Sequence, residues 1–207
     1  MEQRSPEWFE ARLGKATASK ISDIIAKTRN GWGVSRKNYA AQLVAERLSG
    51  QAADSFTNAA MQWGADTEPM AREAYERAQL VSVTEVGFLD HPVVDMSGAS
   101  PDGLVGDDGL VEIKCPNTAT HIDTLQGSAI PTKYFAQMQW QMACCERDWC
   151  DFASFDPRLP LELQLHIRRV ERDSKWLAET EEMVAEFLAE VAGTVEQLTA
   201  MMNKEAA

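Results

Sequence analysis

Apolar positions recur along this chain with two different periods, so the sequence predicts a protein built from both helices and strands. Helical segments carry apolar residues three or four positions apart, whereas strand segments alternate apolar and polar residues. Helices are predicted over residues 5–14, about 17–26, about 36–49, 57–79, 134–145 and about 173–202. Strands are predicted over residues 81–89, 93–97, 149–155 and 161–170. Helices interspersed with strands in this order indicate the α/β (α+β) class.

The first predicted helix has recognisable boundary residues. Ser5 precedes Pro6, which is the favoured order of capping residue and first helical residue, and Gly14 ends the segment. Its apolar face is expected to comprise Trp8, Phe9 and Leu13. Arg12 then lies near the end of the helix, where its guanidinium group is available to a ligand.

A β-hairpin is predicted over residues 102–115. Gly106 and Gly109 bracket two acidic residues between two apolar runs, which is typical of a turn between antiparallel strands. Because side chains alternate along a strand, Glu112 and Lys114 point to one side. The opposite side, facing the core, carries Val111, Ile113 and Cys115. The second strand therefore presents an acid beside a base.

These side chains have the chemistry of a metal site. Asp102 lies at or just before the first strand, so its carboxylate converges with the Glu112 carboxylate and the Lys114 ammonium group. Two carboxylates and the carbonyl of Ile113 suit a hard cation such as Mg²⁺, and Lys114 is placed to orient an attacking water. A surface hairpin with solvated acids is the alternative, but the Asp-Gly turn, the spacing and the apolar strand favour the metal site.

The same residues match the P-D…(D/E)-x-K pattern, and the chain resembles the phage lambda exonuclease (YqaJ-type, alkaline exonuclease) branch of the PD-(D/E)XK nucleases. The resemblance runs from about Trp8 to about Arg172. Its further motifs are Arg12-Leu13-Gly14 with Thr17-Ala18-Ser19, Trp63-Gly64 through Glu68, Ser100-Pro101-Asp102-Gly103, Glu112-Ile113-Lys114-Cys115-Pro116, Tyr134 with Ala136-Gln137 and Gln139, and Asp156-Pro157-Arg158. It implies a restriction-endonuclease-like core in which helices flank a central mixed β-sheet.

The resemblance also implies a function. Members of this branch use Mg²⁺, with Mn²⁺ as a substitute and one or two ions per site, to degrade one strand of linear duplex DNA from its 5′ end. They release 5′-mononucleotides and leave a 3′ overhang. They form a homotrimeric ring around DNA and pass the overhang to a single-strand annealing protein for recombination. Two alternatives stay open: a structure-selective or site-specific endonuclease, and an inert DNA-binding subunit.

Two further residues are expected at the catalytic centre by resemblance. Glu68 would hold water or a second ion, although an exposed helical acid is the alternative. Gln137 would contact the scissile phosphate or the nucleophilic water. It shares a helix face with Tyr134 and Gln141, because these residues are three and four positions apart. An exposed polar stripe is the alternative for that face.

Other residues, Tyr134 among them, are expected by resemblance to bind the DNA. Arg12, Thr17 and Ser19 would form an anion pocket, because helix N-termini and hydroxyls attract anions. The resemblance implies that its ligand is the 5′-phosphate of the DNA end. On sequence alone, Ser19 is more simply a helix N-cap. By resemblance, Arg29 would contact the downstream duplex and Met61 would wedge between the strands at its end. The helical periodicity instead favours a core position for Met61.

One departure from the resemblance concerns the end phosphate. Relatives in the phage lambda group carry an arginine in the stretch that follows Cys115-Pro116, where this chain has Asn117-Thr118-Ala119-Thr120-His121. The role of that arginine is then missing or passes to Thr118, Thr120 or His121. The sequence therefore predicts a weaker dependence on 5′-phosphorylation.

Length and charge refine this interpretation. A chain of 207 residues is most simply one domain, with a helical N-terminal part over about 1–79 and a C-terminal helix over about 173–203. The net charge is −12, but residues 1–50 hold nine Lys or Arg against five Asp or Glu. A polyanion would therefore bind through one face, on the N-terminal part.

The cysteines and the apolar runs indicate where the protein acts. Four cysteines lack the spacing of a metal cluster or a disulfide framework, so reduced and mostly buried thiols are expected. No apolar run approaches membrane-spanning length, and the first residues lack the apolar core of a signal peptide. The expected location is the cytoplasm of a bacterial or phage-infected cell.

Overall fold

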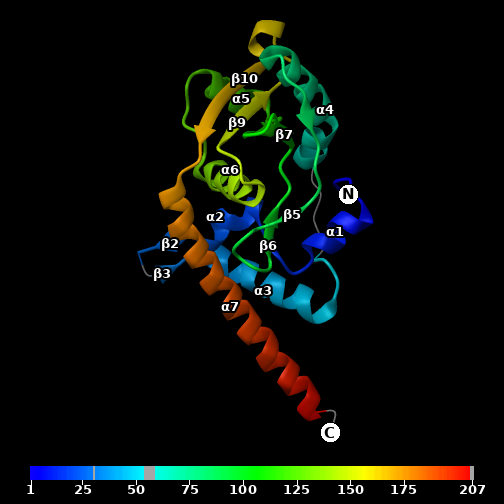
Figure 1. Cartoon of the computed structure of the whole chain (residues 1–207), viewed down its shortest axis with the longest axis vertical. Coiled ribbons are helices and arrows are strands. Elements are labelled where there is room, and N and C mark those ends of the chain that lie inside the picture. Colours follow the sequence, from blue (N-terminus) through cyan, green and yellow to red (C-terminus); the bar gives the residue numbers. More distant parts are fainter. Residues whose placement is uncertain (30, 54–58, 206–207) are drawn as a thin grey trace.

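The computed structural model describes residues 1–29, 31–53 and 59–205 (Figure 1). Its helices are α1 (Pro6–Arg12), α2 (Ile21–Ile24), α3 (Val34–Ser49), α4 (Ala59–Gln79), α5 (Thr118–Leu125), α6 (Thr132–Cys145) and α7 (Ser174–Glu205), with 3-10 turns η1 (Ala18–Lys20) and η2 (Leu161–Leu163). Its strands are β1 (Ala16–Thr17), β2 (Lys27–Thr28), β3 (Gly31–Trp32), β4 (Val83–Thr84), β5 (Leu89–Asp90), β6 (Ser97–Ala99), β7 (Gly103–Val105), β8 (Gly109–Lys114), β9 (Trp149–Phe155) and β10 (Leu165–Glu171). This mixture confirms the predicted fold class.

A five-stranded mixed sheet forms the centre, in the strand order β10-β9-β8-β7-β4. Strands β8 and β9 are parallel, and the other pairs are antiparallel. The predicted hairpin is confirmed as β7–β8, with Gly103 paired to Val111. Gly106 has a φ of 56° in its turn, a backbone conformation that favours glycine. A smaller sheet has the order β1-β6-β5.

Helices cover both faces of the central sheet. On one face, Ala71 and Tyr75 of α4 pack against a buried cluster that includes Val111 and Ile113 of β8. On the other face, Met138 and Met142 of α6 pack against Leu110, Cys150 and Phe152. Alternation along β8 therefore directs Val111 and Ile113 toward α4 and Leu110 and Glu112 toward α6.

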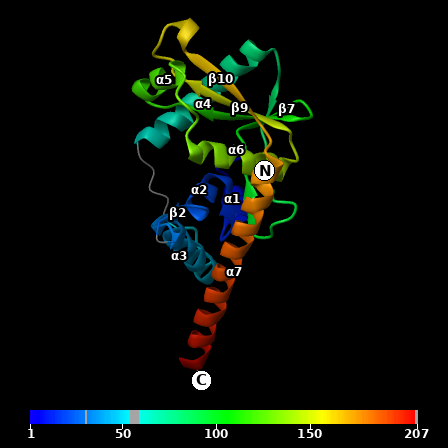
Figure 2. The ribbon, with the colours of Figure 1, turned by 90° about the vertical axis from the view of Figure 1, so that its left-hand side faces the viewer.

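A third apolar cluster lies below the sheet and joins the N-terminal helices to α6 and α7. Its largest members are Trp140, Tyr39 and Phe187, and the rings of Tyr39 and Phe187 stack at 5.8 Å. Helix α7 runs from the sheet along this cluster, and its last turns extend past α3 in both views (Figures 1 and 2). Within the described part of the chain, none of the helices is both long and apolar enough to cross a bilayer.

Several element boundaries differ from the predictions. The strands predicted over residues 81–89 and 93–97 shrink to β4, β5 and β6. A turn separates β5 from β6, where the amides of Val93 and Val94 donate to Nδ1 of His91. The helix predicted over 17–26 begins as the 3-10 turn η1, and Thr17 rather than Ser19 occupies its N-cap position. The strand predicted from Leu161 begins at Leu165, after η2.

The long helices were predicted more closely. Helices α6 and α7 and strand β9 match their predicted ranges within about two or three residues at either end. Helix α4 begins at Ala59 in the described residues, and residues 57 and 58 lie outside them. Ser5 caps α1 as predicted, since its hydroxyl accepts from the Trp8 amide at 3.3 Å. Phe9, expected on the apolar face of α1, is 47% exposed.

Candidate active site

The β7–β8 hairpin brings the predicted acids and base together. Asp102 lies directly before β7, and its Oδ2 accepts a hydrogen bond from the Ile113 amide of β8 at 2.7 Å. Glu112 and Lys114 point to the same side of β8, where the Lys114 ammonium contacts Oε1 of Glu112 in an ion pair. The structure thus places both carboxylates, the ammonium group and the backbone of Ile113 at one end of the hairpin.

Helix α6 holds the Glu112 carboxylate from the opposite side. Gln137 donates from Nε2 to Oε1 of Glu112 at 2.7 Å, and Gln141 donates from Nε2 to Oε2 at the same distance. Glu112 and Gln141 are fully buried, so these bonds compensate the loss of water around the carboxylate. Tyr134 completes this face, with its ring centroid 5.2 Å from the Lys114 nitrogen. The exposed-stripe alternative for α6 is therefore wrong.

The electrostatics of the hairpin follow from burial and close charges. Burial raises the pKa of Asp102, and the neighbouring Glu112 carboxylate raises it further, while Lys114 acts in the opposite direction. Burial also disfavours the charged form of Lys114, but the carboxylates of Glu112 and Asp102 outweigh burial and raise the pKa of Lys114. Lys114 therefore stays protonated beside two carboxylates that repel each other.

Glu68 on α4 approaches this centre from another direction. Its Oε1 accepts from Nη2 of Arg72 at 2.8 Å, and its Oε2 accepts from Nη2 of Arg4 at 3.3 Å. Its negative charge contributes to the raised pKa of Asp102, so the two acids are within electrostatic range. Glu68 is not a freely solvated helical acid, since its side chain is only 22% exposed.

The donor set suits one hard cation. Asp102 and Glu112 supply carboxylate oxygens, and Ile113 can add a carbonyl oxygen, which are ligand types that Mg²⁺ accepts alongside water. A divalent cation between the two acids would also relieve the repulsion that raises the Asp102 pKa. In the described part of the chain, no group of three or more His, Cys, Asp or Glu side chains forms a cage. The site thus leaves ligand positions to water and substrate.

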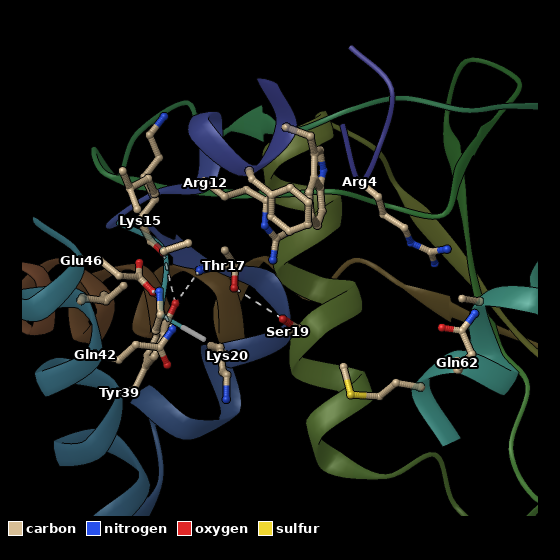
Figure 3. Close-up of a pocket in the computed structure, with 18 residues that line it drawn as sticks. Arg4, Arg12, Lys15, Thr17, Ser19, Lys20, Tyr39, Gln42, Glu46 and Gln62 are labelled. Carbon is tan, nitrogen blue, oxygen red and sulfur yellow. Dashed lines mark hydrogen bonds between the residues drawn. The ribbon is translucent and has the colours of Figure 1, made fainter. Parts of the chain in front are cut away.

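A pocket of about 600 Å³ opens between the N-terminal segment, α1, α3 and α4 (Figure 3). Its lining includes four of the predicted substrate-binding residues, Arg12, Thr17, Ser19 and Met61. The hydroxyl groups of Thr17 and Ser19 lie 3.4 Å apart. Met61 is 55% exposed, so the alternative that it is a core residue is wrong. Two of the predicted residues lie elsewhere: Tyr134 contacts the catalytic hairpin, and Arg29 is exposed next to β2.

The pocket and the catalytic hairpin share a wall. Trp8 lines the pocket, and its indole Nε1 donates to the Ser100 hydroxyl at 2.8 Å, two residues before Asp102. Arg4 also lines the pocket and contacts Glu68. The sequence motifs assign no site role to Arg4, Ser100 or Gln141. The Ser-Pro-Asp motif was the signal for Ser100, whereas nothing in the local sequence marks Arg4.

The segment after the catalytic lysine lies outside the pocket lining. Asn117 caps α5 by accepting from the Thr120 amide at 2.9 Å. His121 is fully buried, and its ring nitrogens lie 2.7 Å from the Ser154 hydroxyl and 2.9 Å from the Leu163 carbonyl. His121 therefore stabilises α5 against β9, and it is not free to bind a phosphate.

The Asp-Pro-Arg motif holds this segment in place. Arg158 donates from Nε to Oδ1 of Asp156 at 2.7 Å and from Nη2 to the Pro116 carbonyl at 3.1 Å. Its guanidinium also lies 4.5 Å from the ring centroid of Trp63 on α4. Arg158 thus connects the end of β8 to the helix that carries Glu68. The cysteines are free thiols, as predicted: Cys144 and Cys150 are buried, and Cys115 and Cys145 are partly buried.

Comparison with known proteins agrees with this geometry. The YqaJ-like viral recombinase domain matches residues 7–148. The crystal structure of LHK-Exo, an alkaline exonuclease from Laribacter hongkongensis, is 49% identical, covers 97% of this chain and 99% of that one, and has a TM-score of 0.90. Another structure of LHK-Exo is a complex with dAMP and matches equally well.

More distant matches carry less information. A phage-related exonuclease from Haemophilus somnus is 17% identical, covers 91% of this chain and 96% of its own, and has a TM-score of 0.72, which shows a shared fold. An uncharacterized protein of Acanthamoeba polyphaga mimivirus is 27% identical over 164 residues, or 73% of this chain. The chain spans only 28% of the length of that viral protein.

The fold, the hairpin and the match to LHK-Exo define the protein as a nuclease. The chain belongs to the family of YqaJ-like viral recombinase domains. The resemblance to lambda-type alkaline exonucleases that the sequence motifs carry is therefore confirmed.

Proposed function

We propose that the protein is a Mg²⁺-dependent exonuclease that degrades one strand of linear duplex DNA from its 5′ end. It releases 5′-mononucleotides and leaves a 3′ overhang. The observation that carries this proposal is the shared wall between the pocket and the catalytic hairpin, formed through the Trp8–Ser100 hydrogen bond and the Arg4–Glu68 contact. The pocket is lined by cations and hydroxyls, which suit the terminal phosphate of a strand.

Each residue of the hairpin has a role in this proposal. Asp102, Glu112 and the Ile113 carbonyl would hold Mg²⁺, with Mn²⁺ as a substitute and a second ion possible toward Glu68. The bound metal supplies Lewis acidity toward the phosphodiester. Lys114 orients the attacking water and offsets negative charge on the phosphate. Gln137 and Gln141 fix the Glu112 carboxylate through their 2.7 Å hydrogen bonds.

The remaining residues would bind the DNA. Arg12, Thr17 and Ser19 take the terminal 5′-phosphate in the pocket, and Met61 at its rim separates the strands. Arg29 contacts the downstream duplex from the β2–β3 hairpin, and Tyr134 supports Lys114 at the catalytic centre. By family resemblance, we also propose a homotrimeric ring and delivery of the overhang to a single-strand annealing protein in the cytoplasm.

The test uses linear duplex DNA labelled at one 5′ end and the same sequence as a closed circle. Both are incubated with the protein and Mg²⁺, and Asp102→Ala serves as the control. Mononucleotide release from linear DNA alone, absent in the variant, is the expected result. Cutting of the circle would instead favour an endonuclease, and cutting of neither substrate would favour an inert subunit.

A further inference from the structure

The N-terminal segment before α1 is fixed against the catalytic motif. The Gln3 side chain donates from Nε2 to the carbonyls of Val86 and Pro101, both at 2.8 Å. Pro101 directly precedes Asp102. On the other side of Arg4, Ser5 begins α1 and its hydroxyl accepts from the Trp8 amide. Two flanking anchors therefore determine where Arg4 lies.

Arg4 is held in an uncommon backbone conformation. Its φ is 68°, in the left-handed region that residues other than glycine rarely adopt. The anchors at Gln3 and Ser5 maintain this conformation. It directs the side chain to the pocket, where Figure 3 shows Arg4 and Gln62 on one side and Lys15, Lys20 and Glu46 on the other. The Arg4 side chain is 59% exposed, so its guanidinium is accessible to a ligand.

The other cations of the pocket differ in how far they are already paired. Lys15 forms an ion pair with Asp90 at 2.6 Å, and Lys20 forms one with Asp23 at 3.2 Å. Arg12 has its guanidinium 3.9 Å from the Trp8 ring centroid and, within the described ranges, makes no ion pair to a carboxylate within 4.0 Å. Arg12 therefore supplies one guanidinium for an anion, while both lysines are partly neutralised.

Glu46, an acid that lines the pocket, already accepts hydrogen bonds from neighbouring groups. Glu46 accepts from the Gly14 amide at 3.0 Å through Oε2 and from Gln42 at 2.8 Å through Oε1. These hydrogen bonds already compensate part of the Glu46 charge, and among the described residues that line the pocket Glu46 is the acid, across from Arg4 in Figure 3.

The contact between Arg4 and Glu68 is replaceable. It measures 3.3 Å, whereas Arg72 binds the other oxygen of Glu68 at 2.8 Å from within the same helix. Glu68 therefore keeps a cationic partner when Arg4 turns toward a ligand. A guanidinium group binds phosphate through two parallel hydrogen bonds. The Arg4 contact with Glu68 uses a single nitrogen and is therefore weaker than such a phosphate contact.

We propose that Arg4 is the second guanidinium group that binds the 5′-terminal phosphate, opposite Arg12. This inference rests on the proposed function, because it needs a DNA end in the pocket. It assigns to the N-terminal segment the role that the stretch from Asn117 to His121 does not fill. It also replaces the expectation of weaker phosphate dependence with a strong preference for phosphorylated ends.

The test measures binding rather than cleavage, so it does not depend on catalysis. Duplexes with a 5′-phosphate or a 5′-hydroxyl are titrated by fluorescence anisotropy against protein that carries Lys114→Ala. Arg4→Gln and Arg4→Lys are compared in this background. Arg72→Gln is the matched control, because it also removes a cation from Glu68 but lies outside the pocket lining. Arg77→Gln, an exposed arginine of α4, controls for net charge.

Arg4→Gln is expected to reduce the preference for the phosphorylated end roughly 10-fold, as for loss of one charge-assisted hydrogen-bonded pair. Arg4→Lys retains part of the preference, and both control variants retain it in full. Equal weakening on both ends, or the same loss in Arg72→Gln, would overturn the proposal. The Lys114→Ala protein can prefer the phosphorylated end while the protein with Lys114 intact releases no nucleotide. In that case the exonuclease proposal fails and the role of Arg4 stands.

Discussion

Gln141 of α6 donates a hydrogen bond to Oε2 of Glu112 on β8 over 2.7 Å, and both side chains are fully buried. One turn earlier on the same helix, Gln137 donates to the other oxygen of Glu112. A buried carboxylate is tolerated only when hydrogen bonds or cations replace its water. Helix α6 is therefore part of the catalytic machinery as well as a cover for the sheet.

Gln141→Leu should impair both catalysis and stability. Leucine removes the donor to Glu112, so the buried Oε2 loses its hydrogen bond at a cost of about 1–3 kcal/mol in the free energy of unfolding. The carboxylate then turns away from Asp102, and kcat on linear DNA is expected to fall at least roughly 10-fold. Gln137→Leu, at a half-buried position, should lose activity with a smaller change in stability. Wild-type kcat in Gln141→Leu would contradict the positioning role.

Lys114→Ala should abolish cleavage and leave DNA binding largely intact. Lys114 contacts Glu112 at the catalytic hairpin, while the pocket that holds the strand end has no Lys114 in its lining. Loss of a charge-stabilising group at the reacting phosphate is expected to lower kcat by roughly 100-fold or more. Nucleotide release and anisotropy binding are measured on the same duplex. A fall in affinity as large as the fall in kcat would reassign Lys114 to substrate binding.

The catalytic hairpin could be predicted because its information is local. The turn at Gly106 and the alternation along β8 determine which side chains share a face, so Glu112 and Lys114 could be placed together. The residues of α6 that contact Glu112 were predicted only in part. The spacing put Gln137 and Gln141 on one face, but only packing of α6 against β8 shows that this face is buried.

The pocket required long-range information. Arg4 reaches it because Gln3 binds the carbonyls of Val86 and Pro101, which are 83 and 98 residues away in sequence. No periodicity carries such a contact. Met61 was misjudged for the same reason, since helical spacing counts it with the apolar face while the structure leaves it at the open rim of the pocket.

Metal binding should be visible as stabilisation that depends on Asp102. The repulsion between Asp102 and Glu112 raises the pKa of Asp102 and destabilises the metal-free protein. At a Mg²⁺ concentration 100 times its Kd, binding adds about 2.7 kcal/mol to the free energy of unfolding. Asp102→Asn should raise the metal-free stability by roughly 0.5–2 kcal/mol, as relief of strain at a functional site does, and should remove the Mg²⁺ effect. Denaturant titrations with a chelator and with Mg²⁺ measure the metal-free free energy of unfolding and its increase on metal binding. An undiminished Mg²⁺ effect in Asp102→Asn would exclude Asp102 as a ligand.

His91 provides a separate test of the fold, away from the hairpin. Its imidazole is buried and stacks on Trp140 with ring centroids 4.4 Å apart, and its Nδ1 accepts from the amides of Val93 and Val94. Burial, and secondarily the charge of Arg172, lowers the pKa of His91 to about 4, although Glu181 lies 3.5 Å from Nε2. The folded protein therefore holds His91 neutral at a pH where the unfolded chain protonates it.

Stability should consequently fall as the pH drops below the unfolded pKa of about 6.5. Above that pH the neutral form is present in both states and His91 imposes no penalty; between 6.5 and about 4 only the unfolded state gains the proton. At about 1.4 kcal/mol per unit, unfolding at pH 5 is favoured by roughly 2 kcal/mol relative to pH 7.5 through this residue. His91→Asn keeps an acceptor for the two amides but does not titrate. Urea unfolding at both pH values should show a shallower acid loss in His91→Asn, and an equal loss in both proteins would mean that His91 is protonated in the fold.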